Sequence, residues 1–273
     1  MKQQTLAKNA YFSGIGLHTG DKTNLTIKPA PENSGIIFKR TDLDGIPEIL
    51  ANANNVTDVT RATTISDNGA HVVTVEHILA TFHALNIDNA IVEMDKAEPP
   101  LADGSSEPFI KIVLEAGIIE QNADAEYWEC KETIIVEEGD SKLVMTPADE
   151  FKITCIVSYG ETAMDTQYYS NAITPEIFQN EIMGARTFCS YREIEAMIAM
   201  DIVKGGSLDN AVILHEGAII SKEGLRYKDE MVRHKVLDIV GDIFLVGKRI
   251  KGHIIAIKPG HPINVKLAQK IVS

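Results

Sequence analysis

The stretch from Asp229 to Phe244 reads Asp-Glu-Met-Val-Arg-His-Lys-Val-Leu-Asp-Ile-Val-Gly-Asp-Ile-Phe and predicts a helix with two unlike faces, over about 229–246. The apolar face repeats at helical spacing and consists of Val232, Val236, Ile239, Val240 and Ile243. The opposite face carries His234, Asp238 and Asp242 at positions i, i+4 and i+8, with Lys235 beside them. The stripe predicts packing on a core, which leaves the second face for polar chemistry.

The polar face of this helix has two interpretations, a metal site or an exposed ladder of polar side chains. His234 and Asp238 lie one turn apart, so both can ligate one metal ion. Asp242, a turn further on, is placed to orient a neighbouring group. Gly241 costs a helix on the order of 1 kcal/mol against alanine, which predicts close packing at that position. The spacing alone leaves both interpretations open.

A second helix, predicted over about 74–86, also carries polar residues beside an apolar stripe. The stripe consists of Val75, Ile78, Leu79, Phe82 and Leu85. Glu76 and His77 lie off it, on a face otherwise formed by Ala80 and Ala84, where another surface could approach closely. Thr74 suits the N-cap, so Glu76 is expected in the first turn, where a carboxylate is favoured. The alternative is that both polar residues simply face solvent.

A third histidine, His261, follows the predicted strand 253–258 in the segment Lys258-Pro-Gly-His261, which is expected to be a loop. A histidine on a loop at a strand end is a common position for catalysis. It is equally common for an idle surface side chain, so the position alone decides nothing.

The rest of the chain predicts an α+β fold with two domains. Strands are expected over 133–136, 142–146, 152–159, 211–214 and 218–221, with a third helix over 190–200. Leu25 and Ile27 share one face of an earlier strand. The polar stretch 121–126 is the expected boundary, which gives domains 1–124 and 125–273. Both halves mix strands and helices without regular βαβ alternation, which favours sheets layered on helices.

The composition excludes several classes of protein. Hydrophobic residues make up 44% and charged residues 24%, as in ordinary globular proteins. The net charge of −13 argues against nonspecific nucleic-acid binding, which needs a basic face. No stretch approaches the ~20 apolar residues of a membrane-spanning helix, and the start lacks a secretory core, so a cytoplasmic protein without stable membrane insertion is expected. Cys130, Cys155 and Cys189 stand far apart, so any metal is expected on histidines and carboxylates.

Seven short segments follow one another along the chain in a distinctive order. They are Gly14-Ile-Gly-Leu-His-Thr-Gly20, Thr74-Val-Glu-His77, Asp103-Gly-Ser105, Ala185-Arg-Thr-Phe188, Gly205-Gly-Ser207, Arg233-His-Lys-Val-Leu-Asp-Ile-Val-Gly-Asp242 and Gly260-His261. From about residue 4 to about residue 270 the chain thereby resembles the UDP-3-O-acyl-N-acetylglucosamine deacetylases of lipid A biosynthesis. The resemblance implies two α+β domains of similar topology, each a sheet layered on helices, with the active site between them. It implies hydrolysis of the substrate's N-acetyl group with release of acetate.

The resemblance also implies a metal and a general base. His77, His234 and Asp238 would be the zinc ligands, and three protein ligands leave a fourth position for water, as in catalytic zinc sites. Glu76, next to a ligand, would take the proton of the attacking water. Iron(II) could fill the same site in the cell, because affinity order alone does not settle metal identity.

The remaining catalytic roles fall on residues of the second half. Thr187 and a protonated His261 would stabilise the charge that builds on the carbonyl oxygen. His261 would also donate the proton to the departing amine, with Asp242 keeping it cationic. Whether Glu76 or His261 delivers that proton stays open. Lys235 is expected beside these groups.

Substrate binding divides among phosphates, sugar, base and acyl chain. Lys235, Lys258 and His261, with Lys204, are expected to bind the diphosphate, Phe188 the glucosamine and Tyr159 the uracil. The acyl chain is expected to run through an insert at about 191–220, whose apolar residues are Ile194, Ile198, Val203, Ala211 and Ile213. Many relatives have Asp-Phe in place of Ser158-Tyr159, and Gly-Phe in place of Cys189-Ser190, which bears on affinity rather than on catalysis.

Two other functions fit parts of the pattern. A non-haem Fe(II) oxygenase also uses two histidines and one carboxylate, but it gives Glu76 and His261 no clear task. A non-catalytic module, in which metal only staples two domains, predicts that both residues are dispensable. The family leans to monomers, so a monomer that binds a small UDP-linked acyl-glucosamine, and no nucleic acid, is expected.

Overall fold

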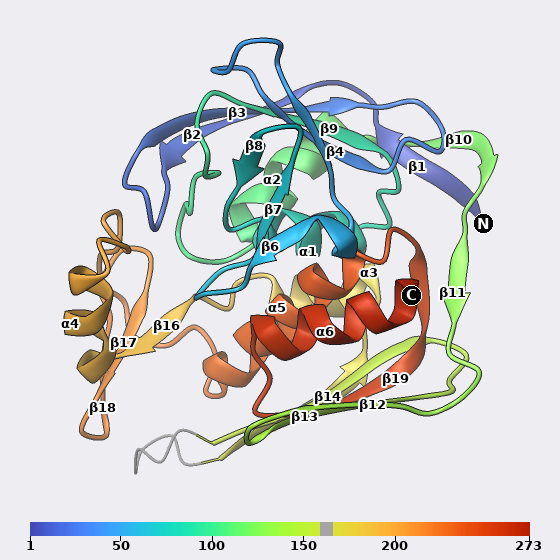
Figure 1. The fold of residues 1–273 in the computed structure, drawn as a ribbon. Helices are drawn as coiled ribbons and strands as arrows, with labels where there is room; N and C mark the ends of the chain where they lie inside the picture. The colour runs from blue at the N-terminus through green and yellow to red at the C-terminus, as the bar shows by residue number, and fades with distance from the viewer. Residues whose placement is uncertain (159–165) are drawn as a thin grey trace.

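The computed structural model describes residues 1–158 and 166–273, and two β-sheets with helices between them form its main layers (Figure 1). The first sheet has the strand order β2 (Ala10–Ile15), β3 (Lys22–Pro29), β9 (Ala90–Met94), β4 (Ile36–Arg40) and β5 (Glu48–Leu50). The second has the order β12 (Ile134–Glu138), β13 (Ser141–Thr146), β19 (Arg249–Ile257), β14 (Phe151–Val157) and β15 (Gln167–Ala172), and β11 (Tyr127–Glu129) also pairs with β19.

The two sheets share one topology. Along the five strands of each order, antiparallel pairings flank one parallel pairing, which joins β4 to β9 in the first sheet and β14 to β19 in the second. The extra strand β11 adds a second parallel pairing to β19. The expected fold, α+β with two sheet-on-helix units of similar topology, is therefore confirmed. The exact boundary after residue 124 stays a prediction.

The helices occupy the space between the sheets (Figure 1). They are α1 (Glu76–Ala84), α2 (Glu107–Ala116), α3 (Pro175–Ile177) with the π-helical turn η2 (Phe178–Ile182), α5 (Glu230–Phe244) and α6 (His261–Val272). Helix α2 contacts β2 of the first sheet, whereas α5 contacts β14 and β15, and α6 contacts β12 and β13 of the second. Helices α1 and α5 pack against each other, so one from each half meets at the centre.

Alternating burial explains how the strands close this core. In β14 every second residue is buried, from Phe151 to Val157, and in β3 Leu25 and Ile27 are buried on one face as expected. Because side chains alternate across a strand, each sheet turns one apolar face to the helices. The buried side chains of both sheets and of the central helices form one continuous hydrophobic cluster.

Smaller elements lie at the edges of this arrangement. The turn η1 (Ala53–Asn55) precedes a small sheet of β6 (Val56–Asp58), β7 (Thr64–Asp67) and β8 (Ala70–Val72), and β1 (Lys2–Leu6) pairs with β10 (Ile118–Asp124). The expected insert at about 191–220 contains α4 (Tyr191–Ala199), β17 (Val212–His215) and β18 (Ala218–Ile220), and it projects at one side (Figure 1). The strand β16 (Phe188–Ser190) directly precedes the insert and pairs with β17. No helix in the described part of the chain is long and apolar enough to cross a membrane.

Two local expectations are wrong. Thr74 is not the N-cap, because Val75 occupies that position and the Thr74 hydroxyl donates to Glu98 Oε1 at 2.7 Å. His261 does not lie on a loop; it is the first residue of α6, which the sequence analysis did not predict. Proline at the start of that helix, Pro262, was the available signal, since its fixed φ suits a first turn.

Candidate active site

The close contact between α1 and α5 positions the central side chains. A Cβ built on Gly241 of α5 would lie 2.1 Å from the carbonyl oxygen of Glu76 on α1, so only glycine allows this approach. The packing expected at Gly241 is thereby confirmed. Glu76 and His77 are buried under α5, so the solvent-facing alternative for this pair is wrong.

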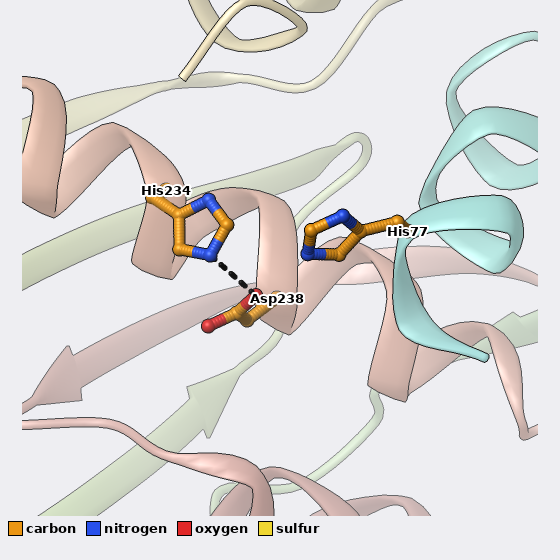
Figure 2. A group of neighbouring side chains, drawn as sticks. All are labelled: His77, His234 and Asp238. Carbon is orange, nitrogen blue, oxygen red and sulfur yellow. Dashed lines mark ion pairs between the residues drawn. The ribbon is translucent and has the colours of Figure 1, made fainter. Parts of the chain in front are cut away.

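His77, His234 and Asp238 meet across this helix contact, with His77 from α1 and the other two from α5 (Figure 2). One ligand atom of each lies within 4.8 Å of the others. The two imidazole rings are 5.3 Å apart edge to face, and His234 Nε2 lies 3.4 Å from Asp238 Oδ1. The interpretation of this helix face as an exposed ladder is therefore wrong, because His234, Asp238 and Asp242 are buried, with Asp238 only 1% exposed.

The donor atoms are in the state that a divalent metal requires. Burial, with the nearby His234, lowers the pKa of His77 to about 3, and burial also lowers the pKa of His234, so both rings are neutral at pH 7. Burial opposes ionisation of Asp238, but Lys235 and His234 outweigh it and hold its pKa below the usual range. Asp238 Oδ1, the atom that lies 3.4 Å from His234 Nε2, is buried without a hydrogen-bond partner in the described residues. Buried polar atoms are normally satisfied, so the group fits a metal ion.

Neighbouring groups orient two of these three side chains. His234 Nδ1 lies 3.0 Å from the carbonyl oxygen of Ala185, which leaves Nε2 free to face Asp238. Such a contact fixes the tautomer and the ring orientation of a ligating histidine. Lys235 Nζ donates to Asp238 Oδ2 at 2.8 Å and lies 5.4 Å from the centre of the Phe188 ring.

A second buried group, formed by Glu76, His261 and Asp242, lies beside the first. Asp242 Oδ2 accepts from His261 Nδ1 at 3.0 Å and from Asn264 Nδ2 at 2.9 Å. The other nitrogen of the ring, His261 Nε2, is 3.9 Å from Glu76 Oε1. Thr63 completes the group through its backbone N–H, which donates to Glu76 Oε2 at 3.1 Å.

Glu76 and His261, two ionisable members of this group, differ in how readily they accept or keep a proton. Burial raises the pKa of Glu76 to about 7, although the His261 cation opposes the shift. Burial alone would lower the pKa of His261, but the Asp242 and Glu76 carboxylates outweigh it and raise that pKa to about 9. A carboxyl group that titrates near neutrality, next to an imidazolium, can accept a proton while its neighbour holds one.

A cavity of about 440 Å³ opens over both groups. It contains most of the catalytic residues expected from the sequence, and its lining includes Glu76, His77, Thr187, Phe188, His234, Lys235, Asp238 and His261. Asp242 lies behind His261, fully buried. The arrangement thus offers a metal-binding group, a proton acceptor and a proton donor on one open space.

Several residues expected to bind substrate lie away from this cavity. Lys204 pairs with Asp201 and borders a neighbouring groove, and Lys258 Nζ is 3.6 Å from Asp140 Oδ2. In the described chain, the cavity lining includes neither lysine, nor any of the five apolar residues of the insert, which are Ile194, Ile198, Val203, Ala211 and Ile213. Tyr159 is outside the described residues. The roles expected of these residues stay predictions.

Sequence reasoning missed several residues that complete the site. Thr63 and Asn264 hydrogen-bond its carboxylates, and Arg61, Leu17 and Leu101 line the cavity. Leu17 lies within the first recognised segment, but the others belong to none of the seven. A lone threonine or arginine carries no periodic or spacing signal, so only the tertiary structure identifies them.

Two of the recognised motifs act as supports. A Cβ on Gly104 would lie 1.9 Å from the carbonyl oxygen of Asn210, and the Gly104 carbonyl accepts from Thr187 N–H at 2.8 Å. A Cβ on Gly205 would lie 2.1 Å from the carbonyl oxygen of Gly16. These glycines allow loops of the first half to contact the insert of the second, which places Thr187 and Leu17 at the cavity.

Comparison with known proteins identifies the family. The model of the UDP-3-O-acyl N-acetylglycosamine deacetylase family matches residues 3–273. A UDP-3-O-acyl-N-acetylglucosamine deacetylase of Marinobacter nauticus is 41% identical over 273 residues, which cover 99% of this chain and 90% of the relative. Those of Myxococcus xanthus and Glaesserella parasuis are 41% and 42% identical, over 99% and 100% of this chain and 86% and 90% of their own. The chain therefore belongs to the UDP-3-O-acyl-N-acetylglucosamine deacetylase family.

Proposed function

We propose that this chain hydrolyses the N-acetyl group of UDP-3-O-acyl-N-acetylglucosamine, releasing acetate and UDP-3-O-acyl-glucosamine for lipid A biosynthesis. Family membership over nearly the whole chain supports the substrate. The observation that carries the proposal is the buried His77, His234 and Asp238 group, with Glu76 and His261 on the same cavity. An amide resists attack by neutral water, and this site holds the groups that such a reaction needs.

The metal of the proposal is zinc, held by His77, His234 and Asp238. Two neutral imidazoles and one carboxylate form a familiar ligand set for catalytic zinc, and Fe(II) is the alternative ion in the cell. Zinc bound there would supply Lewis acidity, which lowers the pKa of bound water to roughly 7 and polarises a carbonyl.

The protein's own residues move the protons. Glu76 accepts a proton from the attacking water, for which a pKa of about 7 is well suited. His261, kept cationic by Asp242, donates a proton to the nitrogen of the breaking C–N bond, so the amine leaves neutral. Thr187 lines the cavity, and its hydroxyl donates to the carbonyl oxygen of the substrate as negative charge grows on that oxygen.

Substrate contacts extend the proposal beyond the cavity. Lys235 and Phe188 line it together and would contact the phosphate and the sugar. Lys258 and Lys204 would supply further positive charge for the diphosphate, and Tyr159 would stack on the uracil. The apolar residues Ile194, Ile198, Val203, Ala211 and Ile213 would form the passage for the acyl chain. The proposed enzyme is a monomer in the cytoplasm, and this part of the proposal rests on the family resemblance alone.

The oxygenase alternative loses its support, because the relatives that match over nearly the whole chain are deacetylases by name. Acetate release without consumption of oxygen would separate the two chemistries. The metal-stapled module is tested by the same variants that test the base.

The decisive experiment replaces Glu76 by alanine and measures acetate release together with metal content. We expect Glu76→Ala to keep its metal but to lose a factor on the order of 10²–10⁴ in turnover, as for the loss of a general base. Glu115→Ala, at an exposed position of α2, is the matched control and should match the wild type. Wild-type turnover in Glu76→Ala would contradict the role of the base and revive the non-catalytic module.

A further inference from the structure

Thr63, the residue before β7, contacts all three members of the second buried group, which are Glu76, His261 and Asp242. Its backbone N–H donates to Glu76 Oε2 at 3.1 Å, and its carbonyl accepts from Val75 N–H at 3.2 Å. Its hydroxyl donates to Asp242 Oδ1 at 2.6 Å and lies 3.4 Å from His261 Nδ1. The residue is fully buried, so water does not compete for these hydrogen bonds.

The Thr63 hydroxyl comes from a different part of the fold than the other hydrogen-bond donors to Asp242. Asp242 lies on α5, and its Oδ2 accepts from His261 and Asn264, both on α6. Within residues 1–158 and 166–273, Thr63 is its only hydrogen-bond donor from outside these two helices. Thr63, a residue of the first half, therefore orients the Asp242 carboxylate, which in turn orients His261.

We propose that Thr63 is a positioning residue that sets the distance between Glu76 and His261. The backbone N–H of Thr63 positions Glu76, and its hydroxyl positions His261 through Asp242. The 3.9 Å distance between Glu76 Oε1 and His261 Nε2 therefore depends on this one residue. The inference rests on the proposed function, which gives Glu76 and His261 their tasks. Catalytic groups displaced by about 1 Å can lose on the order of 10² in rate, so this setting has a measurable consequence.

The alternative is that Thr63 only satisfies a buried carboxylate and stabilises the fold. The two roles differ in what they change. A positioning role affects kcat through the hydroxyl, whereas a purely structural role affects the free energy of unfolding and leaves the kcat of the folded enzyme unchanged. Substitutions that separate the hydroxyl from the side-chain shape distinguish them.

The test measures kcat and KM for a UDP-3-O-acyl-N-acetylglucosamine in Thr63→Val, which keeps the shape, and in Thr63→Ser, which keeps the hydroxyl. We expect Thr63→Val to lose about 10–100-fold in kcat, as for other partners that orient catalytic groups, with KM unchanged. Thr63→Ser should restore most of kcat. Thr64→Val is the matched control, because the Thr64 hydroxyl makes no hydrogen bond within the described part of the chain. This variant should behave as the wild type.

Other outcomes would overturn the inference. Unchanged kcat in Thr63→Val, or equal losses in the valine and serine variants, would show that the hydroxyl does not position the acid. If Thr63→Val does not fold, Thr63→Ala, which introduces no new bulk, takes its place with the same expectations.

An NMR measurement separates this inference from the proposed function. The proton shared between His261 Nδ1 and Asp242 gives a resonance that Thr63→Val should shift and Thr63→Ser should leave near its wild-type position, whether or not the protein hydrolyses the substrate. An unshifted resonance in Thr63→Val would overturn the inference. Absence of acetate release from the wild type would instead overturn the proposed function.

Discussion

Burial shifts the pKa of several ionisable side chains in this protein. His83 shows the effect away from the cavity, because it packs between the rings of Phe151 and Phe244, whose centres lie 4.9 and 4.8 Å away. Its Nδ1 lies 2.8 Å from the carbonyl oxygen of Val240. Burial lowers the pKa of His83 from 6.5 to about 4, so the folded protein keeps this ring neutral.

The neutral state of His83 predicts a pH-dependent stability. Between these two pKa values the unfolded chain binds a proton that the folded chain does not, so the contribution is present above pH 6.5 and is lost as pH falls toward 4. From about pH 7 to about pH 5 the loss amounts to about 2 kcal/mol in the free energy of unfolding. His83→Phe, which cannot titrate, should lack this part of the pH dependence in urea denaturation.

Comparison of the two proteins isolates His83 from the other buried histidines. The stability difference between wild type and His83→Phe should become smaller, or reverse, as the pH falls. Curves that stay parallel from neutral to acidic pH would contradict the burial of a neutral ring at this position.

Among the helices, the contact of α1 with α5 decides whether the site forms. Helix α1 is buried on all sides, although its sequence predicts only one apolar stripe, because α5 covers the second face. Small residues and Gly241 make that cover possible. A helix that is buried all round needs no strong cap, which is consistent with the absence of a side-chain hydrogen bond at its N-cap.

Gly241→Ala tests this helix contact. Alanine is better than glycine in a helix by about 1 kcal/mol, so propensity alone predicts a more stable protein. We expect a loss of about 1–3 kcal/mol instead, because the added methyl group meets the backbone at Glu76 and overpacks the core. Urea denaturation measures the sign, and acetate release should fall as Glu76 moves. A stabilised variant with full activity would show that the helices are farther apart than described.

The sequence predicts the helices that carry ligands better than the groups that support them. Periodicity identified α1 and α5, and the one-turn spacing of His234 and Asp238 placed both on one face. Helix α6 was missed because its apolar residues follow a strand and a Pro-Gly turn that indicate a loop. Thr63 and Asn264 were missed because a single polar residue shows no pattern until the fold brings it to Asp242.

In the whole molecule, two sheets of equal topology face each other across the helices, with a site between the halves (Figure 1). The two halves share no sequence pattern that reveals this symmetry, because many sequences satisfy the same alternation of buried and exposed positions. The resemblance, and not the periodicity, predicted two similar units. The three-residue group that fits a metal ion spans the two halves, since His77 belongs to the first half and His234 and Asp238 to the second.

Joining the halves through a metal predicts that metal removal destabilises the folded protein. An ion that binds only the folded state at about 100 times its dissociation constant adds about 2.7 kcal/mol. Chelation of the wild type should therefore lower the midpoint of thermal unfolding, and zinc should restore it. His77→Ala should lose most of this response, whereas His71→Ala, on the exposed face of β8, should keep it. Identical unfolding with and without metal would contradict a shared ion.

The central claim is that one ion is held jointly by His77, His234 and Asp238 and is needed for hydrolysis. Its most direct test is metal content and acetate release measured on the same preparations of wild type, Asp238→Ala and the exposed control Asp149→Ala. The account predicts about one bound metal ion per chain in the wild type and the control, as for a mononuclear catalytic site. Asp238→Ala should lose both metal and acetate release. Full metal content in that variant would contradict the claim.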